Sequence, residues 1–430
     1  MMPEKSTVRK LLLAGGTVID PAARTARRAD VLLENGRIAA VGTGLRTGDA
    51  ERIDCTGKHI SPGFVDMHCH LREPGREDRE TIATGALSAL SGGFTRICPM
   101  PNTEPPVDTE AQVRFQIRRG EEAGWARIHP VGCCTKGRQG RELAEMGAMV
   151  AAGAVAFSDD GDPVADAMVM RRCLEYSKVF DVPVLSHCEV RELVEGCANE
   201  GWMSTRLGLK AGPDVAESAQ AARDILLAEF TGARLHICHV SARATVDLIR
   251  RAKERGVSVT AETCPHYFTL TEAALADFDT NYRVNPPLRT EADRKAIVAG
   301  LADGTIDVIA TDHAPHIKGE KESEWDNAPA GMIGFETAFS LGYEQLVQSK
   351  VMSLPDCIAR LTLAPARILN LPVHLIEPGS EVDIVILDLK ASWTYAPERV
   401  LSKSANSPFL GLTLRGRVTN AILGETVVSF

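Results

Sequence analysis

The chain contains no run of 18 apolar residues, and its first residues, Met-Met-Pro-Glu-Lys-Ser, lack the hydrophobic segment of a secretory signal peptide. We therefore expect a cytoplasmic protein without a membrane-spanning helix. Aromatic residues make up only 5% of the sequence, and 48 Lys and Arg are scattered among 57 Asp and Glu, for a net charge of −9. There is no basic stripe with interleaved aromatic residues, so we expect no binding to nucleic acid.

Cysteine motifs are also missing, although the chain has 11 cysteines. Their number is odd, no Cys-x-x-Cys occurs, and Cys98, Cys188 and Cys238 lie inside apolar runs. This distribution is typical of reduced thiols in a cytosolic protein. No Gly-x-Gly-x-x-Gly follows an early strand, so an open doubly wound sheet is the weaker of the two α/β folds considered below.

The middle of the chain alternates short apolar runs with longer amphipathic segments. Strand–helix alternation predicts a parallel sheet, and eight repeats in about 250 residues are typical of a (β/α)8 barrel of the TIM type. Helical patterns separate most of the runs, as at 111–123, 165–176, 215–230 and 244–255. The eight predicted strands are 63–70, 93–99, 126–133, 154–158, 182–187, 234–240, 257–263 and 306–311.

Both ends of the chain consist of short strand-and-turn patterns instead. Asn35-Gly36 follows an apolar run, which indicates a β-hairpin, and residues 382–388 and 415–425 form similar patterns near the other end. We infer a composite, β-sandwich-like domain from residues 1–59 and 371–430. Residues 60–370 would then form the catalytic (β/α)8 barrel.

His68 and His70 lie at the end of the first predicted barrel strand. Residues i and i+2 of a strand point the same way, so both imidazoles can face one metal ion, and Arg72 continues the same face. Imidazole and carboxylate groups suit zinc, and a catalytic zinc site leaves a position open for water. Alone, a His-x-His pair is weak evidence for such a site.

Further polar groups follow other predicted strands, and in a barrel these strand ends meet on one face. Buried polar groups without partners cost free energy, so four histidines and two carboxylates at one barrel end are hard to explain by packing. The pattern predicts a metal centre. The groups are Ser158-Asp159-Asp160-Gly161, Ser186-His187-Cys188, Cys238-His239-Val240-Ser241 and Thr311-Asp312-His313-Ala314-Pro315-His316.

This arrangement resembles the amidohydrolase superfamily and, more narrowly, the dihydroorotases of the long bacterial type (class I), over essentially the whole chain. These enzymes interconvert L-dihydroorotate and N-carbamoyl-L-aspartate in pyrimidine biosynthesis. The matching motifs are Asp66–Gly75, Met100–Thr103, Ser158–Gly161, Cys238–Ser241, Glu262–His266, Asn285–Arg289, Ala310–His316 with Lys321, and Ser402–Phe409.

The resemblance implies a zinc centre, with two ions per subunit expected. His68 and His70 would bind one ion, with Asp312 facing it, and His187 and His239 would bind the second. Many relatives bridge the ions with a carboxylated lysine after the fourth strand, but this chain has only aspartates there. Spacing to His187 favours Asp160 over Asp159 as the bridge. Asp312 would also be the catalytic acid–base that moves the proton of the attacking water to the leaving nitrogen.

The resemblance also implies a pocket for a substrate that carries a carboxylate. Arg72 suits this group because guanidinium and carboxylate form two parallel hydrogen bonds. The other implied substrate-binding residues are His70, Asn102, Asn285, His316, Ala330 and Gly331. His313 is expected to point away, and His59, His129, His236, His266 and His374 are assigned no chemistry, although His266 lies at a strand end and could support the site. The polar segment 317–333 is either a lid or a solvated loop.

Two rival functions remain open at this point. A hydantoinase or allantoinase shares the barrel and the His-x-His pair, but usually has the lysine that this chain lacks. A non-catalytic dihydroorotase-like subunit would only scaffold aspartate transcarbamoylase, and such proteins lack metal ligands. An active enzyme can also associate with aspartate transcarbamoylase or form a homodimer, and the sequence does not decide this, nor the identity and number of the metals.

Overall fold

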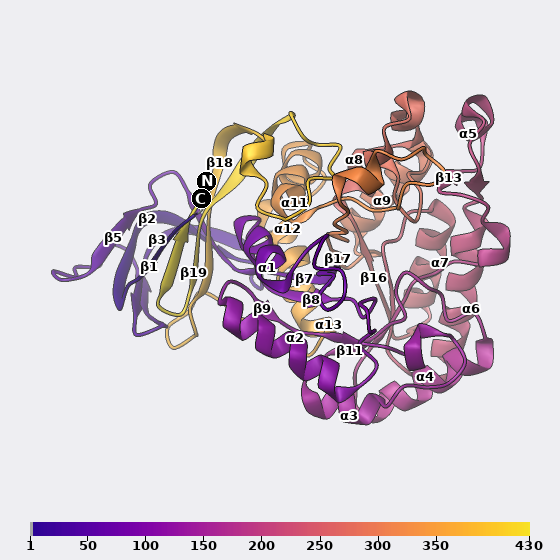
Figure 1. The fold of residues 1–430 in the computed structure, drawn as a ribbon. Coiled ribbons are helices and arrows are strands. Elements are labelled where there is room, and N and C mark those ends of the chain that lie inside the picture. Colours follow the sequence, from indigo (N-terminus) through magenta and orange to yellow (C-terminus); the bar gives the residue numbers. More distant parts are fainter. Residues whose placement is uncertain (1–2) are drawn as a thin grey trace.

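The computed structural model describes residues 3–430, and its central part is a ring of parallel strands surrounded by helices (Figure 1). Two hydrogen-bonded sheets follow chain order around the ring, β7-β8-β9 and β10-β11-β12-β15-β16-β17. The predicted fold class is therefore confirmed. The strands are β7 (Phe64–Cys69), β8 (Phe94–Pro99), β9 (Arg127–Ile128), β10 (Val131–Gly132), β11 (Ala156–Phe157), β12 (Val184–Ser186), β15 (Leu235–Ile237), β16 (Val259–Thr263) and β17 (Val308–Ile309).

The third predicted strand, 126–133, is two short strands in the structure. Pro130 separates β9 from β10, and its backbone has no N–H to donate to a neighbouring strand. β9 pairs with β8, whereas β10 pairs with β11. The interruption therefore lets one segment change partners between the two sheets.

The segment after β17 returns to the first strand of the ring. The backbone N–H of Asp312 donates to the carbonyl of His68 at 3.0 Å, and that of His70 donates to the carbonyl of His313 at 2.8 Å. These bonds set the end of the eighth strand beside the end of the first. Two sequence regions some 240 residues apart thereby share one site.

Helices cover the outside of the strands, and side chains cap the N-termini of several of them. Asp166 accepts hydrogen bonds from Met168 N and Val169 N at the start of α4, and Thr290 forms a capping box at α9. These helices are α1 (Ile82–Ser91), α2 (Glu110–Ala123), α3 (Met146–Ala152), α4 (Ala167–Val179), α6 (Val215–Thr231), α7 (Arg243–Glu254), α9 (Glu291–Asp303), α11 (Phe335–Gly342), α12 (Leu354–Leu361) and α13 (Leu363–Ile368).

Shorter elements lie in the connections between strands and helices. Two-stranded pairing joins β13 (Ala198–Asn199) to β14 (Ala211–Gly212) beside α5 (Trp202–Leu207). The other short helices are α8 (Pro265–Thr269), α10 (Lys318–Lys321), the 3-10 turns at Lys136–Arg138, Arg191–Leu193, Glu272–Asp277, Thr280–Tyr282 and Pro397–Arg399, and a π-helical turn at Tyr343–Gln348. No helix in residues 3–430 is long and apolar enough to cross a membrane.

Strands from both ends of the chain form a single nine-stranded sheet beside the ring (Figure 1). Its order is β1-β20-β19-β18-β6-β2-β3-β4, with β5 on β2, and β18 runs antiparallel to β6. The domain limits given above stay a prediction. The strands are β1 (Glu4–Thr7), β2 (Lys10–Asp20), β3 (Thr25–Glu34), β4 (Arg37–Gly42), β5 (Glu51–Asp54), β6 (His59–Pro62), β18 (Asp383–Thr394), β19 (Thr413–Leu423) and β20 (Thr426–Ser429).

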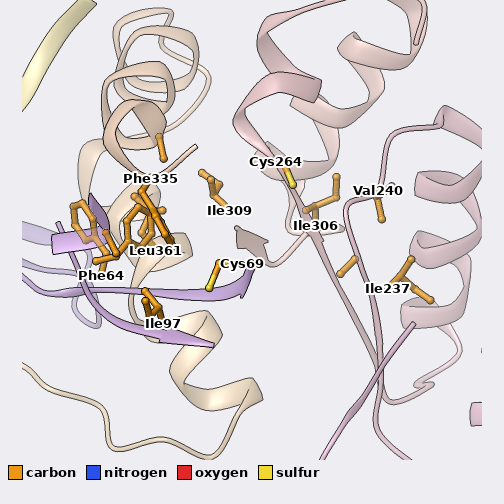
Figure 2. Close-up of a cluster of buried hydrophobic side chains, with 14 of the residues drawn as sticks. Phe64, Cys69, Ile97, Ile237, Val240, Cys264, Ile306, Ile309, Phe335 and Leu361 are labelled. Atoms are coloured by element: carbon orange, nitrogen blue, oxygen red, sulfur yellow. The ribbon is translucent and has the colours of Figure 1, made fainter. Parts of the chain in front are cut away.

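The apolar core fills the space between the ring and its helices. Phe64, Ile97, Phe335 and Leu361 pack on one side of the view in Figure 2, and all four are almost completely buried. Cores of this kind are packed as densely as organic crystals. The strand ends that carry the site are therefore held on a rigid support.

A charged cluster joins the ring to the composite sheet. Oδ2 of Asp383, on β18, lies 3.3 Å from Nε of Arg96 and 3.5 Å from Nη1 of Arg127. The charges of all three residues act on His129. Burial, with smaller contributions from the two arginines, lowers the pKa of His129 from its ordinary value of 6.5 to about 4. His129 is thus neutral in the folded protein at neutral pH.

This histidine should make the fold sensitive to acid. In the unfolded chain this histidine takes up a proton as the pH falls through 6.5, whereas in the folded chain it does so only near pH 4. Its contribution to stability is therefore fully present above pH 6.5 and is lost as the pH falls from 6.5 to about 4. The loss is at most about 3 kcal/mol. We expect His129→Gln to shrink the drop in the urea midpoint between about pH 7.5 and about pH 5. An equal drop in variant and wild type would contradict this.

Candidate metal centre and active site

His68 and His70 project from the end of β7 to the carboxyl face of the strand ring. His68 is fully buried, and its Nδ1 lies 2.5 Å from Oε1 of Glu262 on β16. The Nδ1 of His70 lies 2.8 Å from Oδ1 of Asn102, in the loop after β8. These contacts fix both rings and leave the two Nε2 atoms facing the centre of the site.

Asp160, in the loop after β11, lies between two pairs of histidines. Its Oδ2 is 3.4 Å from Nε2 of His68 and 3.6 Å from Nε2 of His70. Its Oδ1 is 3.3 Å from Nε2 of His239 and 3.5 Å from Nδ1 of His187. Each carboxylate oxygen therefore faces one pair, as a ligand bridging two ions would.

Asp159 points elsewhere. Its Oδ1 accepts a hydrogen bond from the backbone N–H of Thr135 at 3.1 Å, and its other oxygen accepts one from the Thr135 hydroxyl. Adjacent residues of an extended chain face opposite ways, which accounts for the separation. The structure thus brings Asp160, and not Asp159, to the histidines.

His187 and His239 come from the loops after β12 and β15. Their Nδ1 and Nε2 atoms are 3.0 Å apart. Glu189 Oε2 lies 3.2 Å from Nε2 of His187 and accepts a hydrogen bond from Asn285 Nδ2 at 2.7 Å. One carboxylate thus connects this histidine pair to a residue predicted to bind substrate.

Asp312 completes the centre from the segment after β17. Its Oδ1 is 3.0 Å from Nε2 of His70 and 3.6 Å from Nε2 of His68. The preceding Thr311 is fixed by Asp66, which accepts hydrogen bonds from its N–H at 2.9 Å and its hydroxyl at 2.6 Å. The Asp312 carboxylate therefore lies beside the first histidine pair.

Three site residues have left-handed backbone conformations. The φ angles are +60° at Arg72, +32° at His239 and +48° at Asp312. Residues with a Cβ rarely adopt this region, and such conformations concentrate at functional sites, where the surrounding structure compensates their cost. Here the strained backbone turns each side chain from its strand end towards the centre.

The charges at the centre favour ionised carboxylates. Burial alone would raise the pKa of Asp160, but His68, His187 and His239 outweigh it and hold that pKa well below its ordinary value. Burial would also raise the pKa of Asp312, and the hydrogen bond with His70 keeps it lowered. Both groups are therefore acceptors at neutral pH.

The donor set fits a metal ion. Nε2 of His68, which faces the centre, is buried without any hydrogen-bond partner, and this is costly unless another ligand satisfies it. Ligand atoms of His68, His70 and Asp312, and likewise of His68, Asp160 and His239, lie within 4.8 Å of one another. Imidazole nitrogens with carboxylate oxygens are a typical donor set for a catalytic zinc site.

The residues predicted to bind substrate surround this centre. Arg72 Nε donates to the carbonyl of Pro315 at 3.3 Å, and Arg72 Nη2 lies 3.4 Å from Nε2 of His316. His316 Nε2 also lies 2.9 Å from the carbonyl of Ala330, next to Gly331. Burial lowers the pKa of His316, and Arg72 lowers it further, so this ring is neutral. Arg72, His316 and the 330–331 backbone thus form one wall.

Comparison with known proteins identifies the family. Residues 57–245 match the family model described as Dihydro-orotase-like. The dihydroorotase of Pelotomaculum thermopropionicum is 50% identical over 97% of this chain and 98% of its own length. That of Syntrophotalea carbinolica is 49% identical over 96% of this chain and 97% of its own. The chain belongs to the dihydroorotase family.

Solved structures show the same fold at lower identity. The L-hydantoinase of Arthrobacter aurescens superposes with a TM-score of 0.87 at 24% identity, over 97% of this chain and 96% of its own. The D-hydantoinase of a Thermus species superposes with a TM-score of 0.83 at 24% identity, over 97% of this chain and 94% of its own. This dihydroorotase family member therefore shares the TIM-like barrel fold of these hydantoinases.

Two site residues of this dihydroorotase family member were missed by sequence reasoning. Glu262 lies inside a matching motif but was assigned no role; it contacts His68 and, at 3.3 Å, Nε2 of His236. Glu189 contacts His187 and Asn285. Carboxylates behind ligating histidines orient the ring and raise its basicity. Glu189 has a local signal, because it follows His187 by two residues, whereas Glu262 is 194 residues from His68.

The structure also shows the surroundings of His313 and His266, two histidines that were not predicted to bind metal or substrate. His313 points away from the centre, as predicted: its Nε2 lies 3.4 Å from Glu80, and its ring stacks on Phe335 with centroids 4.1 Å apart. His266 is buried, and its Nε2 has no hydrogen-bond partner. It lies close enough to Cys264 and Asp312 for the three to form a possible ligand group.

Proposed function

We propose that this enzyme interconverts L-dihydroorotate and N-carbamoyl-L-aspartate at a centre of two zinc ions. The proposal is carried by one juxtaposition: a guanidinium group, that of Arg72, lies two residues from the His-x-His pair and against His316. This juxtaposition supports a metal centre suited to amide hydrolysis next to a group suited to a carboxylate. Dihydroorotate contains both a cyclic amide and a carboxylate.

We assign the ligands as follows. His68, His70 and Asp312 would hold one ion, His187 and His239 the other, and Asp160 would contact both. When bound, zinc supplies Lewis acidity, which polarises a carbonyl and lowers the pKa of water. Glu262 and Glu189 would fix the rings of His68 and His187.

The protein's own groups carry the proton transfers. Because its pKa is lowered, Asp312 is ionised at neutral pH, and its carboxylate can therefore accept the proton of the attacking water. The water oxygen bonds to the ring carbonyl carbon, the amide C–N bond breaks, and Asp312 returns the proton to the leaving nitrogen. In the reverse direction Asp312 accepts the proton of the ureido nitrogen as the ring closes and water leaves.

Binding residues would orient the ring. Arg72, Asn102 and His316 would hold the carboxylate, and Asn285 with the backbone at Ala330-Gly331 would contact the polar edge of the ring. Because Asn102 also contacts His70, the carboxylate pocket is coupled to the first histidine pair. A bound substrate would therefore have its amide placed towards Asp312 and Asp160.

The direct test is an assay of the purified, zinc-supplemented protein for loss of dihydroorotate absorbance, with metal analysis of the same sample. Turnover of dihydroorotate with two zinc ions per chain supports the proposal. Turnover of hydantoin, allantoin or dihydrouracil instead would keep the metal centre and reject the substrate. Metal binding without any turnover, restored by added aspartate transcarbamoylase, would show that activity requires this partner.

Arg72→Ala should weaken substrate binding more than chemistry. Hydrogen bonds to charged groups contribute about 1.5–3 kcal/mol, so we expect KM for dihydroorotate to rise by about 10- to 100-fold, with a smaller change in kcat. Arg76→Ala is the matched control, since Arg76 is on the same loop but contacts Asp78 and Glu320. An unchanged KM in Arg72→Ala would refute the assigned role.

We propose cytoplasmic location and association, either as a homodimer or with aspartate transcarbamoylase. Light scattering of the protein alone and mixed with aspartate transcarbamoylase tests both kinds of association.

Segment 317–333 is held in place in the structure, since Glu320 of α10 accepts hydrogen bonds from Arg76 at 3.1 Å and from Arg79 at 2.6 Å. Its movement as a lid stays a prediction.

A further inference from the structure

A segment far along the chain contacts the loops of the site. We name residues 402–406 the C-terminal strap; it lies between β18 and β19, the strands of the composite sheet. Lys403 N donates to Glu80 at 3.1 Å, and Ser404 Oγ donates to the carbonyl of Arg79 at 2.7 Å. The strap is thus fastened to the loop that follows β7 and carries Arg72.

Asn406, the last residue of the strap, connects two further loops. Its Nδ2 donates to the carbonyl of Ala314 at 3.0 Å and to that of Gly331 at 3.1 Å. Its Oδ1 accepts a hydrogen bond from the backbone N–H of His316 at 3.0 Å. The residue is 4% exposed, so these bonds are not shared with bulk water.

The geometry requires an amide at this position. An amide offers two N–H donors and one oxygen acceptor, and all three are used here. A carboxylate of the same shape would accept from His316 but would place negative charge against two carbonyl oxygens. In a buried site such unmatched polar groups cost about 1–3 kcal/mol each.

The loops joined by Asn406 have little room to shift. Gly331 has a φ of +131°, and a Cβ there would lie 2.7 Å from Cβ of Ala314 and 3.1 Å from Nε2 of His316. The carbonyl of Gly331 also accepts a hydrogen bond from Lys321 Nζ at 3.1 Å. The strap, His316 and the 330–331 backbone therefore form one interlocked wall of the pocket.

We propose that Asn406 is a positioning residue for substrate recognition. It acts through His316 and the backbone at Ala330-Gly331, and contacts neither the metal ligands nor Asp312. This inference rests on the proposed function, because these groups are the ones assigned to the substrate carboxylate and ring edge. It assigns a part in specificity to the C-terminal strap, which connects β18 to β19 of the composite sheet.

The test compares Asn406→Asp with Asn420→Asp, the same change in β19, where the amide hydrogen-bonds with Thr419 and Ser429. We expect Asn406→Asp to raise KM for dihydroorotate at least about tenfold, with a smaller change in kcat and with unchanged metal content. Asn420→Asp should leave KM unchanged. If Asn406→Asp does not fold, Asn406→Ser removes the paired contacts without adding charge and takes its place.

Hydrogen exchange gives a second readout that does not depend on the substrate. Peptides covering 314–317 and 329–333 should exchange faster in the Asn406 variant, whereas the peptide covering 66–70 should not. Wild-type KM and wild-type exchange in the variant would overturn the inference, as would a loss of kcat and metal with KM unchanged. Absence of dihydroorotate turnover in the wild type would reject the proposed function, and exchange alone would then decide whether Asn406 positions the wall.

Discussion

Replacing Asp312 by asparagine is expected to lower kcat for dihydroorotate by about a hundredfold to ten-thousandfold. The amide keeps the size of the side chain but cannot take a proton from water or deliver it to the leaving nitrogen. Because Asp312 Oδ1 lies 3.0 Å from Nε2 of His70, the substitution also weakens the first ligand group. Steady-state kinetics and metal content of the same sample separate the two effects.

Asp293→Asn is the control for this experiment. Asp293 is also a buried carboxylate, but it caps α9 and accepts a hydrogen bond from Arg243 N at 2.9 Å. Its substitution should lower stability while kcat stays near that of the wild type. A kcat of Asp312→Asn within tenfold of the wild type would contradict the assignment of Asp312 as the acid–base.

The second large effect is expected from Asp160→Asn, which should lower both metal content and turnover. The asparagine side chain has one oxygen and no charge. It therefore cannot present a negatively charged oxygen to each of the two histidine pairs, as Asp160 does. Loss of a group behind a ligand typically costs 10- to 100-fold in metal affinity or activity, so the loss of a direct ligand should cost at least about a hundredfold. Metal analysis after dialysis, followed by kinetics, measures both losses.

The adjacent residue is the matched control for this second substitution. Asp159→Asn changes the same group one position earlier, where the carboxylate contacts Thr135 and no histidine. It should retain the metal and most of the activity, with a moderate loss of stability because Thr135 loses an acceptor. If Asp159→Asn releases the metal and Asp160→Asn does not, the assignment of the bridge is wrong.

The fold could be predicted from the sequence because the strands of the ring are short, apolar and separated by amphipathic helices. The prediction failed within 126–133, where a single strand was expected. Pro130 divides it, and the two pieces pair with different sheets. An apolar run shows that a segment is buried, but does not show which neighbour its backbone bonds.

The site was predictable to the extent that its groups follow strand ends. His68, His70, Asp160, His187, His239 and Asp312 meet at one face because parallel strands of a ring all end there. The supporting groups were harder to find. Glu262 is 194 residues from His68, and Asn406 is 90 residues from His316, so neither contact has a local signal in the sequence.

The composite sheet has a consequence for how the chain is made. β6 ends at Pro62, whereas its neighbour β18 begins at Asp383. A ribosome adding about 5–20 residues per second needs roughly 16–64 s to synthesise the stretch between them. Until then β6 presents an open edge, the kind of surface on which nascent chains aggregate or recruit chaperones. The strap is made later still, so the growing polypeptide should assemble the proposed substrate pocket only after residue 406 has been added.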